Sequence, residues 1–505
     1  MSGLKVVLIK PSKYDLNGVV ERFTAGFMPN ATLYHIASLT PKHIRGVPTT
    51  VHTVDEYVQG SLDYLRLLNA ETDCTTLVGL VGVQSHQFHR ALDLAAYARR
   101  GGVRHVVIGG PHPMTCETST FQNRGVSFAL AEAELIWEEI LQDALKGELQ
   151  PVYGANQRWA KSLGSPIIQP PSHEELKRYW IPMMGLYPVR GCPYSCSYCS
   201  VIKISGRQVR SPSIESTLAS LRRAKKAGVK MVMFVSDNFN KFPEIEELLH
   251  ALIDEQLGLQ FLCQCDAQVV RQPDLVELMA RAGCFQMFVG IESFNRKTLR
   301  SFQKYHNHPQ RYGDMIKMCS EVGIRPHFSN IIGFPDDTEK DVRHHLEILM
   351  DLMPTAASFY VLTPIPGTKQ YDEYRMRGLI RENNLDRFDA TYPTWAHPHI
   401  SAERMYDLLF ECYRKYYTAL MRKRDLEGMD LSFATMSRFL ASKNIHPMSG
   451  GVKKLVIDRC TDYVDLRKDL FGVEMAPLPN SLRLSSEDEM LNKKIEWKRK
   501  AIEKL

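Results

Sequence analysis

The stretch Arg190-Gly-Cys-Pro-Tyr-Ser-Cys-Ser-Tyr-Cys-Ser200 contains three cysteines, Cys192, Cys196 and Cys199, in the spacing CxxxCxxC. Three thiolates can hold a four-iron, four-sulfur cluster and leave one iron without a protein ligand, whereas sites that only transfer electrons usually supply four cysteines. Three cysteines therefore indicate chemistry at the cluster itself. The alternatives are three unrelated buried thiols or a structural zinc site, although zinc sites usually pair two CxxC-like motifs across a long gap and no second pair follows here.

Around this stretch the chain alternates apolar strands with amphipathic helices six times, beginning at about residue 183. Near-continuous apolar strands joined by crossover helices predict a parallel sheet, and six units predict a partial (β/α)6 barrel. Active residues of such barrels gather at the carboxyl ends of the strands. The strands are expected at Met184–Val189, Lys230–Ser236, Leu259–Asp266, Phe285–Ser293, Pro326–Phe334 and Ala357–Pro364.

Polar residues and tight turns follow the predicted strands. They are Ser236, Asp237 and Asn238 after the second, Gln264 and Asp266 at the third, Glu292 and Ser293 at the fourth, Asn330, Ile332 and Gly333 at the fifth, and Pro364 and Gly367 at the sixth. Any single polar residue here could simply cap a helix, because Asp, Asn and Ser are favoured at that position. Their occurrence at five ends, beside the cysteine loop at the first, favours a ligand site along this edge.

The cysteine triplet, with Tyr198 just before its last member, resembles the radical S-adenosylmethionine (SAM) superfamily. The resemblance implies that the three cysteines ligate a [4Fe-4S] cluster, that the amino and carboxylate groups of SAM occupy its fourth iron, and that the reduced cluster cleaves SAM to a 5′-deoxyadenosyl radical. It also implies that Tyr198 and the strand-end residues above bind SAM. The turn Ser236-Asp237-Asn238 departs from the Gly-Gly-Glu-type turn of the family.

Residues 1–150 alternate in the same way and predict a doubly wound α/β sheet, which binds ligands at the carboxyl edge of its strands. Strands are expected at Leu4–Lys10, Thr50–Asp55, Thr76–Val83, Val103–His112 and Val126–Leu130, and helices at about 86–100 and at Ala133–Leu145. A Rossmann-like domain therefore precedes the predicted barrel.

In that position the N-terminal domain resembles the cobalamin (vitamin B12)-binding domain of class B radical SAM enzymes. The resemblance assigns cobalamin contacts to Ser85, to the turn Gly109-Gly110-Pro111-His112, and to Glu132 and Glu134. The family's Gly-Glu-Gly-Glu stretch is Ala131-Glu-Ala-Glu134 here, and the Asp-x-His-x-x-Gly motif that supplies a cobalt ligand in other B12 proteins is absent. A corrinoid without a histidine ligand is therefore expected, and His86, His89 and His112 are not expected to bind cobalt. The alternative is a domain that kept the fold and lost the cofactor, or that serves as a lid.

The domains are expected at residues 1–150, at 184–385 after a proline-containing linker over 151–183, and at 386–505 as a mainly helical region. A long helix should run from Ser401 to about Arg424, with aromatic residues that form core or line a substrate cavity. A net charge of +6 over 505 residues gives no strong case for nucleic acid binding. Eleven cysteines without disulfide-type spacing, no signal peptide and no apolar run of roughly 20 residues indicate a cytoplasmic protein without a membrane span.

The resemblance therefore implies a cobalamin-dependent radical SAM methyltransferase that methylates an unactivated carbon of a small molecule such as a tetrapyrrole, a lipid or a natural product. An external electron donor of the flavodoxin or ferredoxin type is also implied. One alternative is the same architecture performing a cyclisation, ring contraction or oxygen insertion. The other is a non-catalytic cobalamin- or redox-binding protein.

Overall fold

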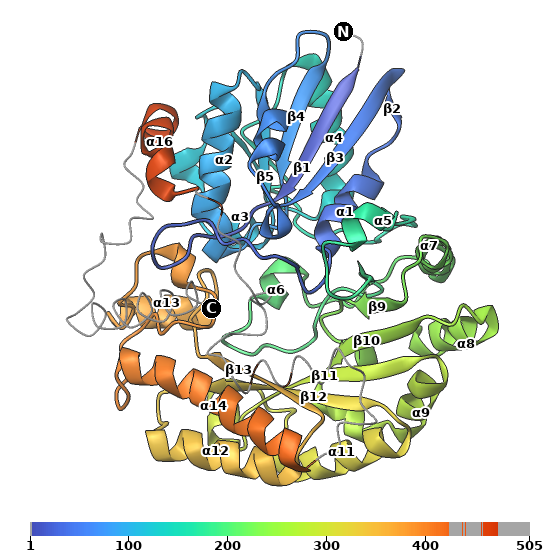
Figure 1. Cartoon of the computed structure of the whole chain (residues 1–505), viewed down its shortest axis with the longest axis vertical. Coiled ribbons are helices and arrows are strands. Elements are labelled where there is room, and N and C mark those ends of the chain that lie inside the picture. Colours follow the sequence, from blue (N-terminus) through green and yellow to red (C-terminus); the bar gives the residue numbers. More distant parts are fainter. Residues whose placement is uncertain (1–2, 424–436, 438–439, 441–455, 457, 473–505) are drawn as a thin grey trace.

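The computed structural model describes residues 3–423, 437, 440, 456 and 458–472. Two sheets lie one above the other along the long axis of the molecule, each with helices packed against it (Figure 1). The first is a seven-stranded sheet and the second a six-stranded sheet. This arrangement confirms the predicted fold class, in which a doubly wound domain precedes a partial barrel and a helical region follows.

The seven-stranded sheet has the order β2-β3-β1-β4-β5-β6-β7, with β1 near its centre. Its strands are β1 Leu4–Lys10, β2 His43–Ile44, β3 Val47–Asp55, β4 Thr75–Leu80, β5 His105–Gly109, β6 Ser127–Ala129 and β7 Val152–Tyr153. All neighbours pair in parallel except β2, which forms an antiparallel hairpin with β3. From β1 the chain first runs to β3 on one side of β1, and it later crosses to β4 on the other side. This reversal creates the topological switch point where such folds bind ligands.

Helices cover both faces of this sheet, and the alternation of side chains along β1 shows how. Leu4, Val6 and Leu8 point into the core that contains α1 (Ala31–Leu39) and α4 (Ala133–Lys146). Val7 and Ile9 point into the opposite core, against α2 (Phe88–Arg100), where α16 (Val464–Phe471) also packs. Successive residues of a strand face opposite sides, so a strand covered on both faces is mostly apolar, and in β1 only Lys5 and Lys10 are not.

The six-stranded sheet has the order β13-β12-β11-β10-β9-β8, all parallel and in sequence order, as expected for consecutive β/α units. Its strands are β8 Met183–Leu186, β9 Met231–Phe234, β10 Gln260–Cys265, β11 Cys284–Glu292, β12 Arg325–Ile332 and β13 Ala356–Val361. The principal crossover helices are α7 Ile214–Lys226, α8 Ile245–Glu255, α9 Pro273–Arg281, α11 Tyr312–Glu321 and α12 Glu339–Leu352. They lie on the outer side of the curved sheet (Figure 1).

The barrel does not close on itself, so its last strand has a free edge, and helix α14 (Ala402–Lys423) covers it. The hydroxyl of Tyr413 accepts a hydrogen bond from Phe359 N and donates one to Phe359 O, both at 2.9 Å. The hydroxyl of Tyr417 does the same at Ala357, at 3.3 and 2.8 Å. The aromatic stripe of this helix is therefore core, and its hydroxyls satisfy the backbone of the edge strand.

Short elements complete the described structure. The remaining helices are α3 Pro111–Thr115, α5 His173–Leu176, α6 Val201–Ile204, α10 Arg296–Ser301 and α13 Lys369–Met376. The 3-10 helices are η1 Glu56–Val58, η2 Asp63–Leu68, η3 Ser85–Gln87, η4 Ser119–Phe121, η5 Phe239–Lys241, η6 Ala267–Arg271, η7 Pro309–Arg311, η8 Leu385–Arg387 and η11 Cys460–Tyr463. Within the described part of the chain, no helix is both long enough and apolar enough to cross a membrane.

The structure differs from the sequence expectation mainly at element ends. Strand β4 stops at Leu80 rather than at Val83, and β5 stops at Gly109 because Pro111 begins helix α3. Helix α1 and the hairpin strand β2 were not expected, and β7 and α5 lie in the segment predicted as a linker. The predicted helix after Ser401 is α14, whereas most of 425–505 lies outside the described residues.

Candidate functional site

The cysteine loop follows β8 and is closed at its base by backbone hydrogen bonds. Arg190 and Arg210 exchange two of them, at 2.8 and 2.9 Å, and Cys192 N donates to Gly206 O at 3.1 Å. Gly191 has φ of +101°, and a side chain at this position would collide with the carbonyl of Gln208. The glycine is therefore required for the two ends of the loop to approach each other.

The three cysteines of this loop have free, half-buried thiols. Burial raises the pKa of the Cys199 thiol to about 12, and the nearby Cys196 and Cys192 thiols add to the rise. Among the described residues, no three His, Cys, Asp or Glu side chains converge on a point that could hold a single metal ion. Three thiols spread around one loop fit a multi-iron cluster, in which each thiolate ligates a different iron.

The turn after β9 contacts the cysteine loop from the barrel side. Asn238 Nδ2 donates a hydrogen bond to the sulfur of Cys192 at 3.0 Å, and Asp237 Oδ2 accepts one from Gly191 N at 2.7 Å. Burial raises the pKa of Asp237, while the bond from Gly191 opposes that rise. The hydroxyl of Ser236 reaches Gln264 O at 3.4 Å. Three of the predicted SAM contacts thus lie beside the loop, and two of them touch it directly.

A second polar group forms where β11 ends. Glu292 accepts a hydrogen bond from the Tyr198 hydroxyl at 3.4 Å and pairs with Lys304 Nζ at 2.8 Å. The Lys304 ammonium also lies 5.9 Å from the centre of the Tyr198 ring. Glu292 has φ of +61°, a left-handed conformation that a non-glycine residue adopts at a cost of about 1–3 kcal/mol and that is common at functional sites. Lys304 was not predicted, because it belongs to no motif and follows a helix rather than a strand.

The other predicted SAM-contact side chains serve the protein locally. Asp266 accepts a hydrogen bond from Gln268 N at 2.7 Å and caps its own 3-10 helix, and Ser293 accepts one from Asn295 N at 3.0 Å. Asp266 therefore has the capping role that the sequence left open, whereas Ser293 forms a turn ahead of Asn295, the residue that caps α10.

Further along the barrel edge the predicted residues are also packed. Asn330 is fully buried, with hydrogen bonds to Phe328 O, Ser358 O and the His345 ring. Ile332 is core and Gln264 is half-buried, Gly333 packs against Met405, and Pro364 is buried ahead of Gly367, which packs against Thr115 of the N-terminal domain. A contact of any of these residues with SAM stays a prediction.

In the N-terminal domain two of the predicted cobalamin-contact regions, Ser85 and the turn Gly109–His112, lie together at the carboxyl edge of the sheet. His112 Nδ1 lies 3.0 Å from Ser85 Oγ, and its ring lies 4.1 Å from that of Phe88. Burial lowers the pKa of His112 to about 3, so the imidazole is neutral near pH 7. Gly110 has φ of +135°, and a side chain here would collide with the backbone of Val83. This turn therefore needs glycine so that two loops of the protein can pack together.

The switch point itself is occupied by a lysine that the sequence did not single out. Lys10, the last residue of β1, donates hydrogen bonds to Gly82 O and, at 2.6 Å, to Gln87 Oε1. Burial lowers the pKa of its amine to about 7, although the nearby Asp55 carboxylate opposes this. The only sequence signal is a lysine that ends a strand whose other residues, apart from Lys5, are apolar.

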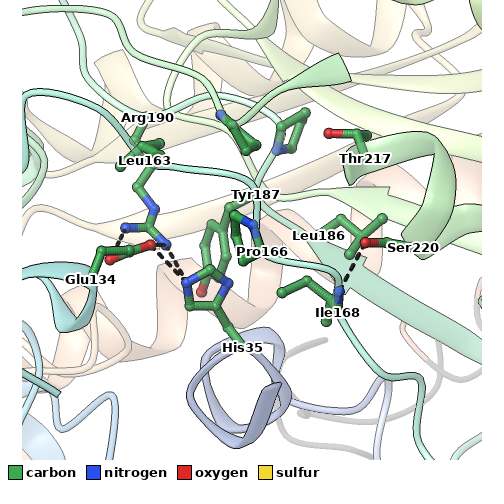
Figure 2. Close-up of a pocket in the computed structure, with 12 residues that line it drawn as sticks. His35, Glu134, Leu163, Pro166, Ile168, Leu186, Tyr187, Arg190, Thr217 and Ser220 are labelled. Atoms are coloured by element: carbon green, nitrogen blue, oxygen red, sulfur yellow. Dashed lines mark hydrogen bonds and ion pairs between the residues drawn. The ribbon is translucent and has the colours of Figure 1, made fainter. Parts of the chain in front are cut away.

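Glu132 and Glu134 lie at the start of α4 and point towards the cysteine loop. Glu132 pairs with Arg210 at 2.6 Å, and Glu134 pairs with Arg190 at 3.0 Å and contacts His35 Nε2 at 2.7 Å. Figure 2 shows Arg190 reaching the Glu134 carboxylate and the His35 ring. The cavity beside this group has room for little more than one water molecule, about 20 Å³, so it is not a cofactor pocket.

Comparison with known proteins agrees with this geometry. Residues 186–349 match the Radical SAM superfamily. A bacteriochlorophyllide d C-12(1)-methyltransferase of Chlorobaculum tepidum is 26% identical over 345 residues, which is 67% of this chain and 74% of that protein.

Two solved structures share the architecture over most of the chain. The radical SAM methyltransferase TsrM of Kitasatospora setae, with tryptophan and a SAM analogue bound, matches with a TM-score of 0.61 and 15% identity, over 97% of this chain and 99% of that one. The cobalamin-dependent radical enzyme OxsB, with aqua-cobalamin and SAM bound, matches with a TM-score of 0.62 and 14% identity. The match covers 92% of this chain and 78% of that one.

The matched segment, residues 186–349, contains the three-cysteine loop and strands β9 to β12 of the parallel barrel, so this part of the chain carries a radical SAM domain. Over most of its length, including the doubly wound domain in front of the barrel, the chain has the fold of these two solved structures.

Proposed function

We propose that this protein is a cobalamin-dependent radical SAM methyltransferase that methylates an unactivated carbon of a small molecule. The observation that carries the proposal is the placement of the cysteine loop against the ligand-binding side of a doubly wound sheet within one chain. The methyltransferase names of two of the similar proteins, one acting on a bacteriochlorophyllide and one solved with tryptophan, support it.

In this function Cys192, Cys196 and Cys199 hold the cluster. When bound, the cluster supplies the electron that cleaves SAM, and the corrinoid carries the methyl group. Asn238 donates a hydrogen bond to the Cys192 sulfur and so stabilises the thiolate form that a metal ligand requires. Asp237 fixes the loop through Gly191 N.

Beside the loop, the paired charges of Glu292 and Lys304 offer a carboxylate and an ammonium next to the Tyr198 ring. The amino acid part of SAM carries the complementary ammonium and carboxylate. These residues are therefore our choice for SAM contacts near the cluster.

The corrinoid would lie at the carboxyl edge of the seven-stranded sheet, near Ser85 and the turn Gly109–His112. One ring nitrogen of His112 is hydrogen-bonded to the Ser85 hydroxyl, and the ring packs against Phe88. Burial lowers the pKa of His112 and so keeps the imidazole neutral. His112 is only 4% exposed, and this burial supports a corrinoid that takes no cobalt ligand from its ring. Lys10 lies at the switch point between β1 and β4, where it would face the bound corrinoid.

The partners follow from the chemistry. A reductant of the flavodoxin or ferredoxin type would supply the electron, and the substrate would be a tetrapyrrole, a lipid or another natural product. All eleven cysteines are free thiols, which supports a reducing cytoplasmic location.

The test is anaerobic reconstitution of the whole chain with iron, sulfide and hydroxocobalamin, followed by removal of unbound material and an absorption spectrum. We expect a corrinoid spectrum beside the broad iron–sulfur absorption, and reductive formation of 5′-deoxyadenosine from SAM. The Cys196→Ala variant should lose the SAM cleavage. A cluster without retained corrinoid would contradict the cobalamin assignment, and SAM cleavage by the Cys196→Ala variant would contradict the cluster assignment.

A further inference from the structure

Two arginines form the base of the cysteine loop. Arg190 precedes Gly191 and Cys192, Arg210 follows the loop, and their backbones pair as an isolated antiparallel bridge. The position of this bridge therefore sets where the segment 191–209, with its three cysteines, begins and ends.

Both arginine side chains extend away from the barrel and meet carboxylates of the N-terminal domain. Arg210 binds Glu132 through two nitrogens, at 2.6 and 3.0 Å, and also donates to Ala160 O at 2.6 Å. Arg190 binds Glu134 through two nitrogens, at 3.0 and 3.1 Å, and lies 3.5 Å from Glu132. Bidentate arginine–carboxylate pairs fix orientation as well as distance.

The rest of the surroundings hold the carboxylates in place. Glu132 also accepts a hydrogen bond from Ala160 N at 2.7 Å, and both glutamates lie at the N-terminal end of α4, where the helix dipole favours negative charge. The guanidinium of Arg190 lies 4.9 Å from the centre of the Tyr187 ring (Figure 2). The side chains of Glu132 and Glu134 are only 5% and 9% exposed, so little of either remains open to a cofactor.

We propose that Glu132 and Glu134 are positioning residues that hold the base of the cluster loop, rather than cobalamin contacts. The domain that faces the corrinoid thereby fixes the loop that carries the cluster ligands. This inference rests on the proposed function only in that the loop holds a cluster.

If Glu132 and Glu134 hold the base of the loop, a variant without their carboxylates should retain the cluster less firmly than the wild type. Replacing both glutamates by glutamine keeps their shape but removes the carboxylates that pair with Arg190 and Arg210, and leaves Asp237 as a weaker counter-charge near both. The bridge between Arg190 and Arg210 should then open more often, which exposes the three thiolates and the cluster to attack.

The experiment compares the whole chain with the double variant Glu132→Gln and Glu134→Gln, each reconstituted without SAM or corrinoid. The rate of loss of the iron–sulfur absorption is measured after adding bathophenanthroline disulfonate, a chelator of ferrous iron. We expect cluster loss at least several-fold faster in the double variant, while its affinity for hydroxocobalamin stays within a factor of two of the wild type. The electron paramagnetic resonance spectrum of the reduced cluster should also change, because it reports thiolate geometry and not global stability.

The matched control is Glu174→Gln, which removes a carboxylate from the first turn of a helix where it pairs with Lys177 on the surface. It should behave as the wild type. Should the double variant fail to fold, Arg210→Lys tests the same contact from the barrel side, since lysine keeps the charge and loses the bidentate geometry. It should also release iron faster.

Two results would overturn the inference alone. One is an unchanged rate of cluster loss with an unchanged resonance spectrum in every variant. The other is loss of hydroxocobalamin binding with a normal cluster, which would make the glutamates cofactor contacts. Failure of the wild type to assemble any cluster would instead overturn the proposed function, and this inference with it.

Discussion

The hydrogen bond from Asn238 to Cys192 makes a quantitative prediction about the reduction potential of the cluster. The amide of Asn238 is 6% exposed, and its Nδ2 lies 3.0 Å from the sulfur. Leucine has nearly the same shape as asparagine and cannot donate, so Asn238→Leu removes this bond with little change in volume. Hydrogen bonds to cluster sulfurs stabilise the more negative, reduced state and raise the potential.

The magnitude follows from the strength of a hydrogen bond to a charged group, about 1.5–3 kcal/mol. The bond exists in both oxidation states, so only its strengthening on reduction contributes, which we take as about 1 kcal/mol. For a one-electron couple a tenfold change in equilibrium corresponds to about 59 mV, so about 1 kcal/mol lowers the potential by about 40 mV.

The assay is an anaerobic redox titration of the reconstituted protein, without SAM or corrinoid, followed by electron paramagnetic resonance of the reduced cluster. Iron and sulfide contents must match between variants, so that only occupied sites are compared. Asn156→Leu, at an exposed position, is the control for the substitution itself. A potential of Asn238→Leu that equals or exceeds that of the wild type would refute the reasoning.

Three further predictions concern stability. Burial lowers the pKa of His112 to about 3, so the unfolded chain binds more protons than the folded one below pH 6.5 and stability is lost as the pH falls. Between pH 7 and 5 the wild type should lose about 2 kcal/mol more than His112→Gln in denaturant titrations, and equal losses would contradict this. Gly110→Ala, at φ of +135° against backbone, should cost about 3 kcal/mol or more, whereas Gly228→Ala, at φ of +85° in open space, should cost about 1 kcal/mol; similar melting temperatures for the two would disprove the contrast. Tyr413→Phe leaves the N–H and C=O of Phe359 unpaired and should cost about 2 kcal/mol or more, which a melt matching the wild type would disprove.

Much of the fold was predictable because its strongest signals are local. The six barrel strands are apolar runs that lie between helical patterns, and every one of them was located to within a few residues. Strand ends were less certain, since β4 stops at Leu80 where the apolar run continues to Val83. Helix α1 escaped prediction for a physical reason: it packs between the sheet and strand β8, so it lacks the one-sided apolar pattern of a surface helix.

The candidate site was predictable only where one motif contains it. The cysteine loop is continuous in sequence, and the capping role of Asp266 follows from its position. The partner of Glu132, by contrast, lies 78 residues away, and a single sequence contains no signal for such a pair. Lys304 is equally unmarked, although it neutralises Glu292 next to the loop.

The contacts between the two domains argue that their relative position is fixed by this chain. A Cβ at Gly185, on β8, would lie 2.6 Å from Ala31 of α1, and one at Gly367 would lie 2.6 Å from Thr115 O. The N-terminal domain therefore packs directly against the backbone of the barrel at two glycines, one on the first strand and one in the turn after the last strand.

The buried ion pairs of Glu132 and Glu134 lie at this same interface, and separating a buried pair leaves charges uncompensated at about 3–5 kcal/mol each. Parting of the domains would break both sets of contacts at once. Substrate access should therefore depend on segments outside this interface, while the distance from the sheet edge to the cysteine loop stays constant through turnover. A methyl group that passes between the sheet edge and the cysteine loop would then move between two positions that the protein holds fixed. Such positioning is the contribution of a protein whose cofactors carry the difficult chemistry.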